Sequence, residues 1–168
     1  MRVLVMCFVL VSQLTLLAVS QQAASPAKRA EAVCTFADGK QIKVEYNSPP
    51  AKREEDFHEG KLWEPGGSPV FLFAQTPLTL GSSVIPDGAY SLYVIPEKQS
   101  WTLVVNRNVT PGSKYDEKQD LVRVQMQIGQ AEDTFKQPQV AFAQAGPKQC
   151  NMRLYYEKVG TWAEFREK

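Results

Sequence analysis

The side chains that could do chemistry gather in one charged segment, residues 51–63, which contains the only histidine of the chain. His58 stands beside Glu55, Asp56 and Glu59, and an imidazole with carboxylates is a donor set that suits a divalent cation. Neighbouring residues of one loop rarely converge on one ion, however, and no second histidine supports the site. The sequence therefore favours a solvated charged loop and predicts no metal site.

Catalytic groups are equally hard to assign. His58 as a general base needs a nucleophile within hydrogen-bond reach, and the chain has no Gly-x-Ser-x-Gly elbow. Two carboxylates across a cleft could hydrolyse a glycoside, but the candidates stand in expected turns, where acids are ordinary: Glu64, Asp87, Asp116 and Asp120. No phosphate-binding glycine loop or dinucleotide fingerprint occurs, so no cofactor is predicted and the catalytic residues stay unknown.

Aromatic side chains offer a binding surface instead. Trp63 stands between the charged segment and the Gly/Pro-rich residues 65–69, so its ring either caps the core or faces a ligand. Together with His58 and Glu64 it defines the loop that we expect to face a ligand. The large aromatics that could line a surface for a sugar or a peptide are Trp63, Trp101, Trp162, Tyr90, Tyr93, Tyr155 and Tyr156. Trp101 and Tyr90 lie inside apolar runs, which favours the core for both.

Length and charge limit the classes of function. A chain of 168 residues corresponds to one domain at roughly 100–200 residues per domain. Its 43% hydrophobic and 22% charged residues exclude a disordered, collagenous or multi-pass membrane chain. The formal net charge of +1 gives no electrostatic footprint for nucleic acid.

The first twenty residues predict export. Arg2 is the only charged residue before Lys28, residues 3–19 are mostly apolar, and Ala18 and Ser20 are small residues at the positions that a signal peptidase reads. The apolar run is at the short edge of the membrane-spanning range and carries polar interruptions, which argues against an uncleaved anchor. We therefore expect a signal peptide over residues 1–20, no transmembrane segment after its cleavage, and a periplasmic or extracellular protein.

Two cysteines remain after this cleavage, because Cys7 is lost with the signal peptide. Cys34 and Cys150, at the two ends of the domain, are an even pair in an exported chain and indicate a disulfide. The alternative is two buried thiols on separate strands. Residues 21–31 are polar without periodicity and are predicted to be a flexible leader, followed by a single domain over residues 32–168.

The domain reads as short strands separated by turns. Extended runs on both sides of Asp38-Gly39 predict a hairpin, and residues 121–128 alternate apolar and polar side chains as a half-buried strand does. Residues 89–95 are apolar on both faces, so they predict a central strand between Pro86 and Pro96. Nine or ten such strands with little helix predict an all-β fold, an antiparallel β-sandwich or a small barrel, and we take the β-sandwich.

Three blocks in the second half of the chain carry a family pattern. Residues 86–96 read PDGAYSLYVIP, residues 101–106 read WTLVVN, and Tyr115 is followed by Asp120 and by an Arg-Val pair at 123–124. Together they resemble a bacterial exported family that is catalogued only as a domain of unknown function. Its members carry a P-A-G-x-Y-S-L-F-x-I-P strand, then W-T-x-x-x-N, then Y-x-x-x-x-D with an R-V strand.

The resemblance extends from Cys34 to the C-terminus and implies an exported β-sandwich-like domain, with no activity, cofactor or catalytic residue to transfer. A fourth family block, W-R-T-G-A-N-E, aligns with residues 63–69. Trp63 and Gly66 persist there, whereas the family's Arg, Asn and Glu fall on Glu64, Ser68 and Pro69. The chain resembles a divergent member, and a binding site formed by that block would have changed its chemistry or its ligand.

These observations favour an exported, non-catalytic β-domain that binds an envelope partner, a glycan or a small ligand. Two other hypotheses remain open. One is a secreted hydrolase that uses carboxylates with or without His58, and the other is a purely structural envelope protein.

Overall fold

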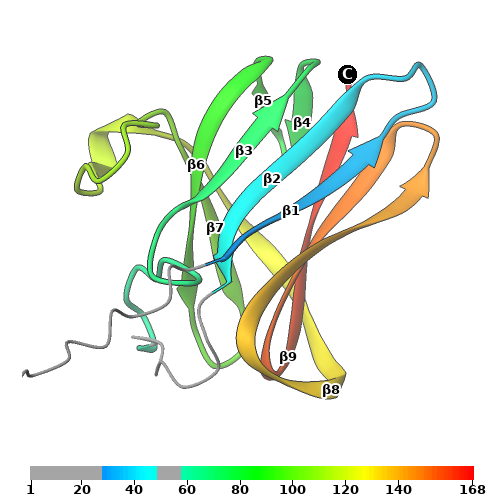
Figure 1. Ribbon diagram of the computed structural model, residues 1–168. Helices are drawn as coiled ribbons and strands as arrows, with labels where there is room; N and C mark the ends of the chain where they lie inside the picture. The colour runs from blue at the N-terminus through cyan, green and yellow to red at the C-terminus, as the bar shows by residue number, and fades with distance from the viewer. Residues whose placement is uncertain (1–27, 49–57) are drawn as a thin grey trace, which may run out of the picture.

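The computed structural model describes residues 28–48 and 58–168 of the chain (Figure 1). The predicted signal peptide, the leader up to residue 27 and the charged residues 51–57 lie outside this part. The structure is all-β and antiparallel, as the sequence predicts. Its strands are β1 (Lys28–Thr35), β2 (Gln41–Ser48), β3 (Val70–Ala74), β4 (Leu78–Leu80), β5 (Ser83–Ile85), β6 (Gly88–Pro96), β7 (Trp101–Asn106), β8 (Asp120–Gly146) and β9 (Gln149–Glu167).

All nine strands belong to one sheet in the order β1-β2-β3-β6-β7-β8-β9-β4-β5. A single turn of 3-10 helix, η1 (Glu117–Gln119), precedes β8. Within residues 28–48 and 58–168, no helix is long and apolar enough to cross a membrane. β1 begins at Lys28, so the last residues of the predicted leader 21–31 belong to the sheet.

β8 and β9 are much longer than the predicted strands. The runs 121–128 and 140–143 belong to one strand of 27 residues, and the runs 150–156 and 161–165 belong to one strand of 19 residues. The pairing of β8 with β9 shifts register between Gln130 and Phe135 and again before Gln139. Bulges of this kind admit extra residues and bend a strand without ending it. Gly129 and Pro138, which lie near these positions, therefore mark irregularities within β8. The sequence had indicated separate strands there.

The predicted hairpin at Asp38-Gly39 is confirmed. β1 and β2 pair from Thr35↔Gln41 outward, and Gly39 has a φ of 89°, which suits a residue without a side chain. Ile42 and Val44 on β2 are fully buried, as the alternation of this strand requires. The strand at residues 89–95 is confirmed as central, because β6 pairs with β3 on one side and with β7 on the other.

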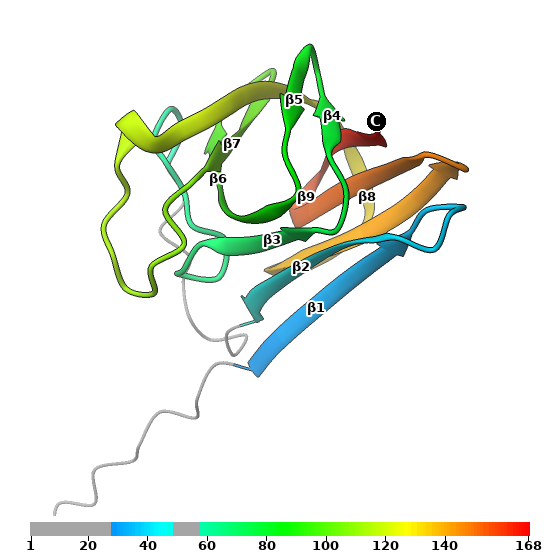
Figure 2. The ribbon, with the colours of Figure 1, turned by 90° about the horizontal axis from the view of Figure 1, so that it is seen from above.

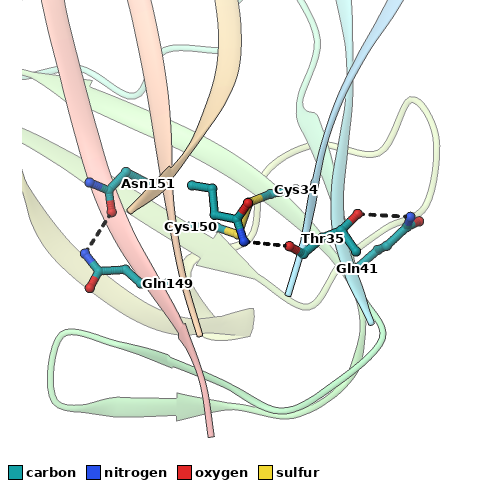
Figure 3. The surroundings of a disulfide bond; sticks show 7 residues. Cys34, Thr35, Gln41, Gln149, Cys150 and Asn151 are labelled. Carbon is teal, nitrogen blue, oxygen red and sulfur yellow. Dashed lines mark hydrogen bonds between the residues drawn. A yellow bond between two sulfur atoms is a disulfide. The ribbon is translucent and has the colours of Figure 1, made fainter. Parts of the chain in front are cut away.

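The sheet curls until its two halves meet, so the core lies on its concave side (Figure 2). β1, an edge strand of the sheet, lies beside the hairpin that β8 and β9 form. Gln144 Nε2 on β8 donates to the Thr35 carbonyl at 3.1 Å, and the Ala37 amide donates to the Pro147 carbonyl at 2.8 Å. The predicted disulfide is present at this closure: Cys34 and Cys150 are bonded, with Cα atoms 6.3 Å apart and both side chains buried (Figure 3).

Candidate ligand-binding site

Trp63 and Glu64 point to opposite sides of the sheet. The Trp63 amide donates to the Val94 carbonyl at 2.7 Å and the Val94 amide donates back at 3.0 Å, so the chain before β3 pairs with the end of β6. Paired residues in antiparallel strands share a face, and the next residue faces the other way. Trp63 therefore joins Val94 in the core, and Glu64 lies on the outer face beside Tyr93.

Trp63 is a core residue. Its side chain is 2% exposed, and its ring lies 5.9 Å from Trp101 in an edge-to-face contact and 5.2 Å from Tyr156. Of the two positions that the sequence left open for this ring, the structure places it in the core. The other two residues of the loop that we expected to face a ligand are His58, which is exposed, and Glu64, which is half-buried. Burial raises the pKa of the Glu64 carboxyl.

The segment between β7 and β8, residues 107–119, covers part of the outer face. Tyr93, Val104 and Asn106 face away from the main core, yet each is buried at 1% exposure or less. The contacts that hold this segment include Tyr93 against Tyr115 with ring centroids 4.9 Å apart, Ser91 Oγ to the Asn108 carbonyl at 2.6 Å, and Asn106 Nδ2 to the Asp116 carbonyl at 2.9 Å.

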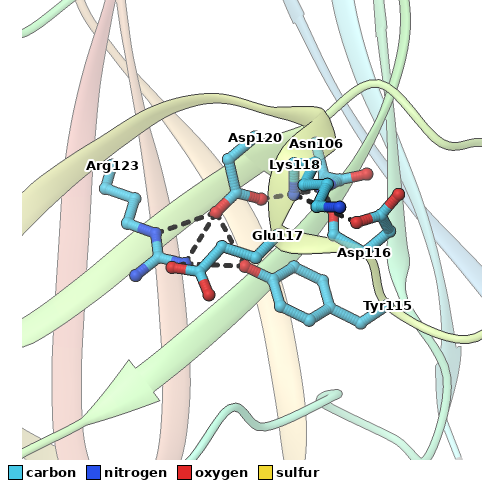
Figure 4. Close-up of polar contacts among 7 residues, drawn as sticks. All are labelled: Asn106, Tyr115, Asp116, Glu117, Lys118, Asp120 and Arg123. Carbon is cyan, nitrogen blue, oxygen red and sulfur yellow. Dashed lines mark hydrogen bonds and ion pairs between the residues drawn. The ribbon is translucent and has the colours of Figure 1, made fainter.

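Asp120 is the centre of the polar network beneath this segment (Figure 4). Its Oδ1 accepts from Asn106 Nδ2 at 2.7 Å, and its Oδ2 accepts from the Tyr115 hydroxyl at 2.7 Å and from Arg123 Nε at 2.8 Å. Arg123 Nη2 also donates to the Tyr115 hydroxyl and to Glu117, at 2.8 Å each. These side chains thus bind one another and hold the segment 107–119 against the sheet.

The network predicts the titration of Tyr115. Burial, reinforced by the hydrogen bond to the Asp120 carboxylate, raises the pKa of the Tyr115 hydroxyl to about 12. Replacing Asp120 by Asn removes the negative charge, so we expect the Tyr115 pKa in D120N to fall toward the ordinary value of about 10. The measurement is the pH dependence of the tyrosine ring NMR signals, with Y115F to assign the resonance.

The sign of the linked stability follows from that shift. A tyrosine whose pKa is higher in the folded state stabilises the protein fully below pH of about 10, and this contribution is lost as the pH rises through about 12. Because the Tyr115 pKa is expected to be lower in D120N, this contribution to stability should be smaller and should be lost at a lower pH. An unchanged Tyr115 pKa in D120N would show that the carboxylate does not act on the hydroxyl.

A hollow of about 450 Å³ lies elsewhere on the molecule, where β8 and β9 pair with each other beyond the end of β7. Its lining combines three aromatic residues, three charged residues and a strip of small or polar ones: Phe135, Tyr155, Trp162, Glu132, Asp133, Arg153, Gly129, Gln130, Ala131, Gly160 and Thr161. This volume falls within the range of small-molecule sites. We call it the Trp162 hollow.

Two glycines form the floor of the Trp162 hollow. Gly129 and Gly160 are direct partners across β8 and β9, so neither strand supplies a side chain at this point. A Cβ atom at Gly129 would lie 3.5 Å from Cζ3 of Trp162, and one at Gly160 would lie 3.2 Å from Cε1 of Tyr155. Each ring therefore lies against one glycine. A strand glycine marks a bulge, as beside the register shift that follows Gln130, or the close approach of a ligand or of another chain.

The walls and the rim differ in chemistry. Phe135 stacks on Tyr155 with ring centroids 4.9 Å apart and planes 24° apart, which supports one aromatic wall opposite Trp162. Glu132, Asp133 and Arg153 are exposed at the rim and bring charges of both signs. Aromatic faces are negative and attract polarised C–H groups, while the rim can accept and donate hydrogen bonds. This arrangement can hold a ligand ring and bind its polar substituents.

The sequence matches the family described as "Protein of unknown function (DUF2911)" over residues 25–165. The chain belongs to the DUF2911 family. The resemblance to an uncharacterised domain family is thereby confirmed. No curated protein and no solved structure matched the chain.

The three blocks that suggested this family meet on one face of the DUF2911 domain. β6 contributes Ser91 and Tyr93, β7 contributes Asn106, and the third block contributes Tyr115 and Asp120. Their common role is to position the segment 107–119 on the sheet.

The fourth block has a steric reason for its retained glycine. Gly66 has a φ of 83°, and a Cβ atom there would lie 2.1 Å from the Asn47 carbonyl oxygen, so no other residue fits. Ser68 and Pro69 in the same block line a smaller hollow of about 140 Å³ together with Arg29 and Glu45.

The candidate residues from the sequence do not form one site in this DUF2911 domain. His58, Trp63 and Glu64 lie apart from the Trp162 hollow, and within the described ranges no group of three or more His, Cys, Asp or Glu side chains could hold a metal ion. Trp162 and Tyr155 were among the aromatics expected to line a binding surface. Gly129 and Gly160 were missed, because their pairing across two strands depends on the bulged register of β8 and β9. The sequence signal that could have indicated these two positions is a glycine inside a β-rich run with an aromatic residue nearby.

Proposed function

We propose that this protein is an exported, non-catalytic β-domain that binds a neutral, hydroxyl-rich ring ligand, a glycan, in the Trp162 hollow. The observation that carries the proposal is a glycine floor between two aromatic walls with a rim of mixed charge. Aromatic side chains gathered in one hollow and rimmed by polar residues are typical of a ligand-binding groove.

Two features support export. Residues 1–20 have the pattern of a signal peptide. Cys34 and Cys150 form a buried disulfide, a bond that persists in oxidising compartments and is rare in the cytosol.

The charges of the hollow favour a neutral ligand. Glu132 and Asp133 oppose Arg153, which leaves little positive charge for an anion such as a phosphate ester. Arg153 in the lining also disfavours a cation. A neutral ligand with hydroxyl groups can use donors and acceptors of both signs at once.

Two of the acids considered for hydrolysis have structural partners. Asp116 caps η1 by accepting from the Lys118 amide at 3.1 Å, and Asp120 accepts from Asn106, Tyr115 and Arg123. These contacts support a binding role over a carboxylate-dependent hydrolase.

Calorimetric titration with a panel of neutral oligosaccharides tests the proposal. We expect saturable binding by the wild-type protein and a loss of about tenfold or more in affinity for W162A, because truncating a central aromatic removes most of the contact with a ring. G129V should also lose binding, since its methyl groups would fill the floor beneath Trp162.

The controls share the chemistry of these variants but lie elsewhere. Phe73 is an exposed aromatic on the outer face of β3, and F73A should bind as the wild type does. Gly146 is a β8 glycine whose added Cβ would meet only Gln149, at 3.8 Å, so G146V is the control for G129V. Equal affinity of W162A and F73A, or no binding of any oligosaccharide, would refute the proposal, and turnover of the bound sugar would refute its non-catalytic part.

A further inference from the structure

We infer that the ligand is a chain of at least two sugar rings that crosses Trp162 and occupies a second hollow on its far side. This inference rests on the proposed function, because it assigns the length of the ligand to the same site.

The second hollow, of about 230 Å³, shares Trp162 with the first. Its remaining walls come from the end of β4, the start of β8 and the end of β9, and its polar lining consists of Thr79, Gln125, Gln127, Glu164 and Arg166. Because one side chain lines both hollows, they are adjacent and Trp162 separates them.

Side chains of the outer face of β8 and β9 line both hollows, and the second hollow is also lined by the core-side residues Leu80, Val124 and Ala163. On β8, Gln125 and Gln127 alternate with the buried Met126; on β9, Trp162 and Glu164 alternate with the buried Ala163. Gln127 is the direct partner of Trp162 across the two strands. The hollows therefore follow one another along β8 and β9, on either side of Trp162.

The two hollows together are longer than one sugar ring. From Gln125 in the second hollow to Gly129 in the first, β8 advances by four residues, or on the order of 13 Å at the usual rise of a strand. A single six-membered ring cannot contact both ends, whereas two or three linked rings can.

The second hollow has the polarity that a further sugar unit requires. Arg166 Nε donates to Glu164 Oε1 at 2.9 Å, so these two charges compensate each other. Gln125, Gln127 and Thr79 add amide and hydroxyl groups, which both donate and accept. Side chains of β8 and β9 line both hollows, so a ligand bound there would contact side chains and not the main chain of a strand edge. An extended peptide instead gains affinity mainly from the main-chain groups of a strand edge.

A length series of neutral oligosaccharides, from one sugar unit upward, tests this inference by calorimetry. For the wild-type protein we expect affinity to rise by about tenfold between one unit and two or three units, then to level off. Q125A should remove much of this rise without changing the affinity for one unit, because Gln125 lines only the second hollow. Gln99, an exposed glutamine in the turn between β6 and β7, lines neither hollow, so Q99A is the matched control.

The outcomes separate the inference from the function on which it rests. Equal affinity for every length, or identical length series for Q125A and Q99A, would overturn the second subsite and leave the Trp162 hollow as a single-ring site. Binding of no oligosaccharide would refute the proposed function itself. Binding of an extended peptide in place of the oligosaccharides, with the same loss in Q125A, would overturn the assignment of a glycan.

Discussion

Replacing Cys34 and Cys150 together by alanine is expected to lower the free energy of unfolding by about 4 kcal/mol. The two cysteines are 116 residues apart in sequence, so the bond closes a loop that spans most of the domain and strongly restricts the unfolded chain. It also joins the edge strand β1 to β9, where the curled sheet closes. Alanine is the suitable replacement, because serine would place hydroxyl groups in a buried site.

Equilibrium denaturation in urea, without reductant, measures this effect. Wild-type protein unfolded in the presence of a thiol reductant is the control, since it loses the bond and keeps both sulfur atoms. It should show nearly the same loss, and it also provides the measurement if the double variant does not fold. A difference below about 1 kcal/mol between reduced and oxidised wild type would show that the sheet closure is stable without the bond.

Replacing Trp63 by alanine is expected to cost about 3–5 kcal/mol, the range for truncating a large buried aromatic. The ring is 2% exposed and packs against Trp101 and Tyr156, so its removal leaves a cavity between two further aromatic rings. W63F should recover part of the loss because it restores some of the volume. Denaturation midpoints and near-ultraviolet circular dichroism report the stability and the packing of the rings.

Trp162 is the matched control for this experiment. It is half-buried on the outer face, so W162A should cost much less than W63A while it removes ligand binding. The two variants thus separate a tryptophan of the core from a tryptophan of the proposed site. A larger loss of stability in W162A than in W63A would contradict both assignments.

Local patterns predicted much of the fold. The Asp38-Gly39 turn fixed the β1–β2 hairpin, and the apolar character of both faces of residues 89–95 placed β6 at the centre of the sheet. The length of β8 and β9 could not be predicted in this way. A glycine or a proline within a run is compatible with a turn or with a bulge, and the choice depends on the partner strand.

The candidate site was predicted only in part. Trp162 and Tyr155 belonged to the aromatics expected at a binding surface, but so did Trp63, for which the sequence left open whether the ring caps the core or faces a ligand. Its burial follows from the pairing with Val94, a contact between residues that the sequence alone does not connect. The same alternation turned Glu64 outward, away from Trp63.

The sequence by itself determined the strand-forming runs, the tight turns, the cysteine pair and the family, because each of these depends on residues close in sequence or on composition. Only the tertiary structure decided which aromatic rings are covered and which glycines face each other. Those properties depend on strand register, and a shift of one residue moves every side chain to the opposite face. The register of β8 against β9 brings Gly129 opposite Gly160 and thereby opens the Trp162 hollow.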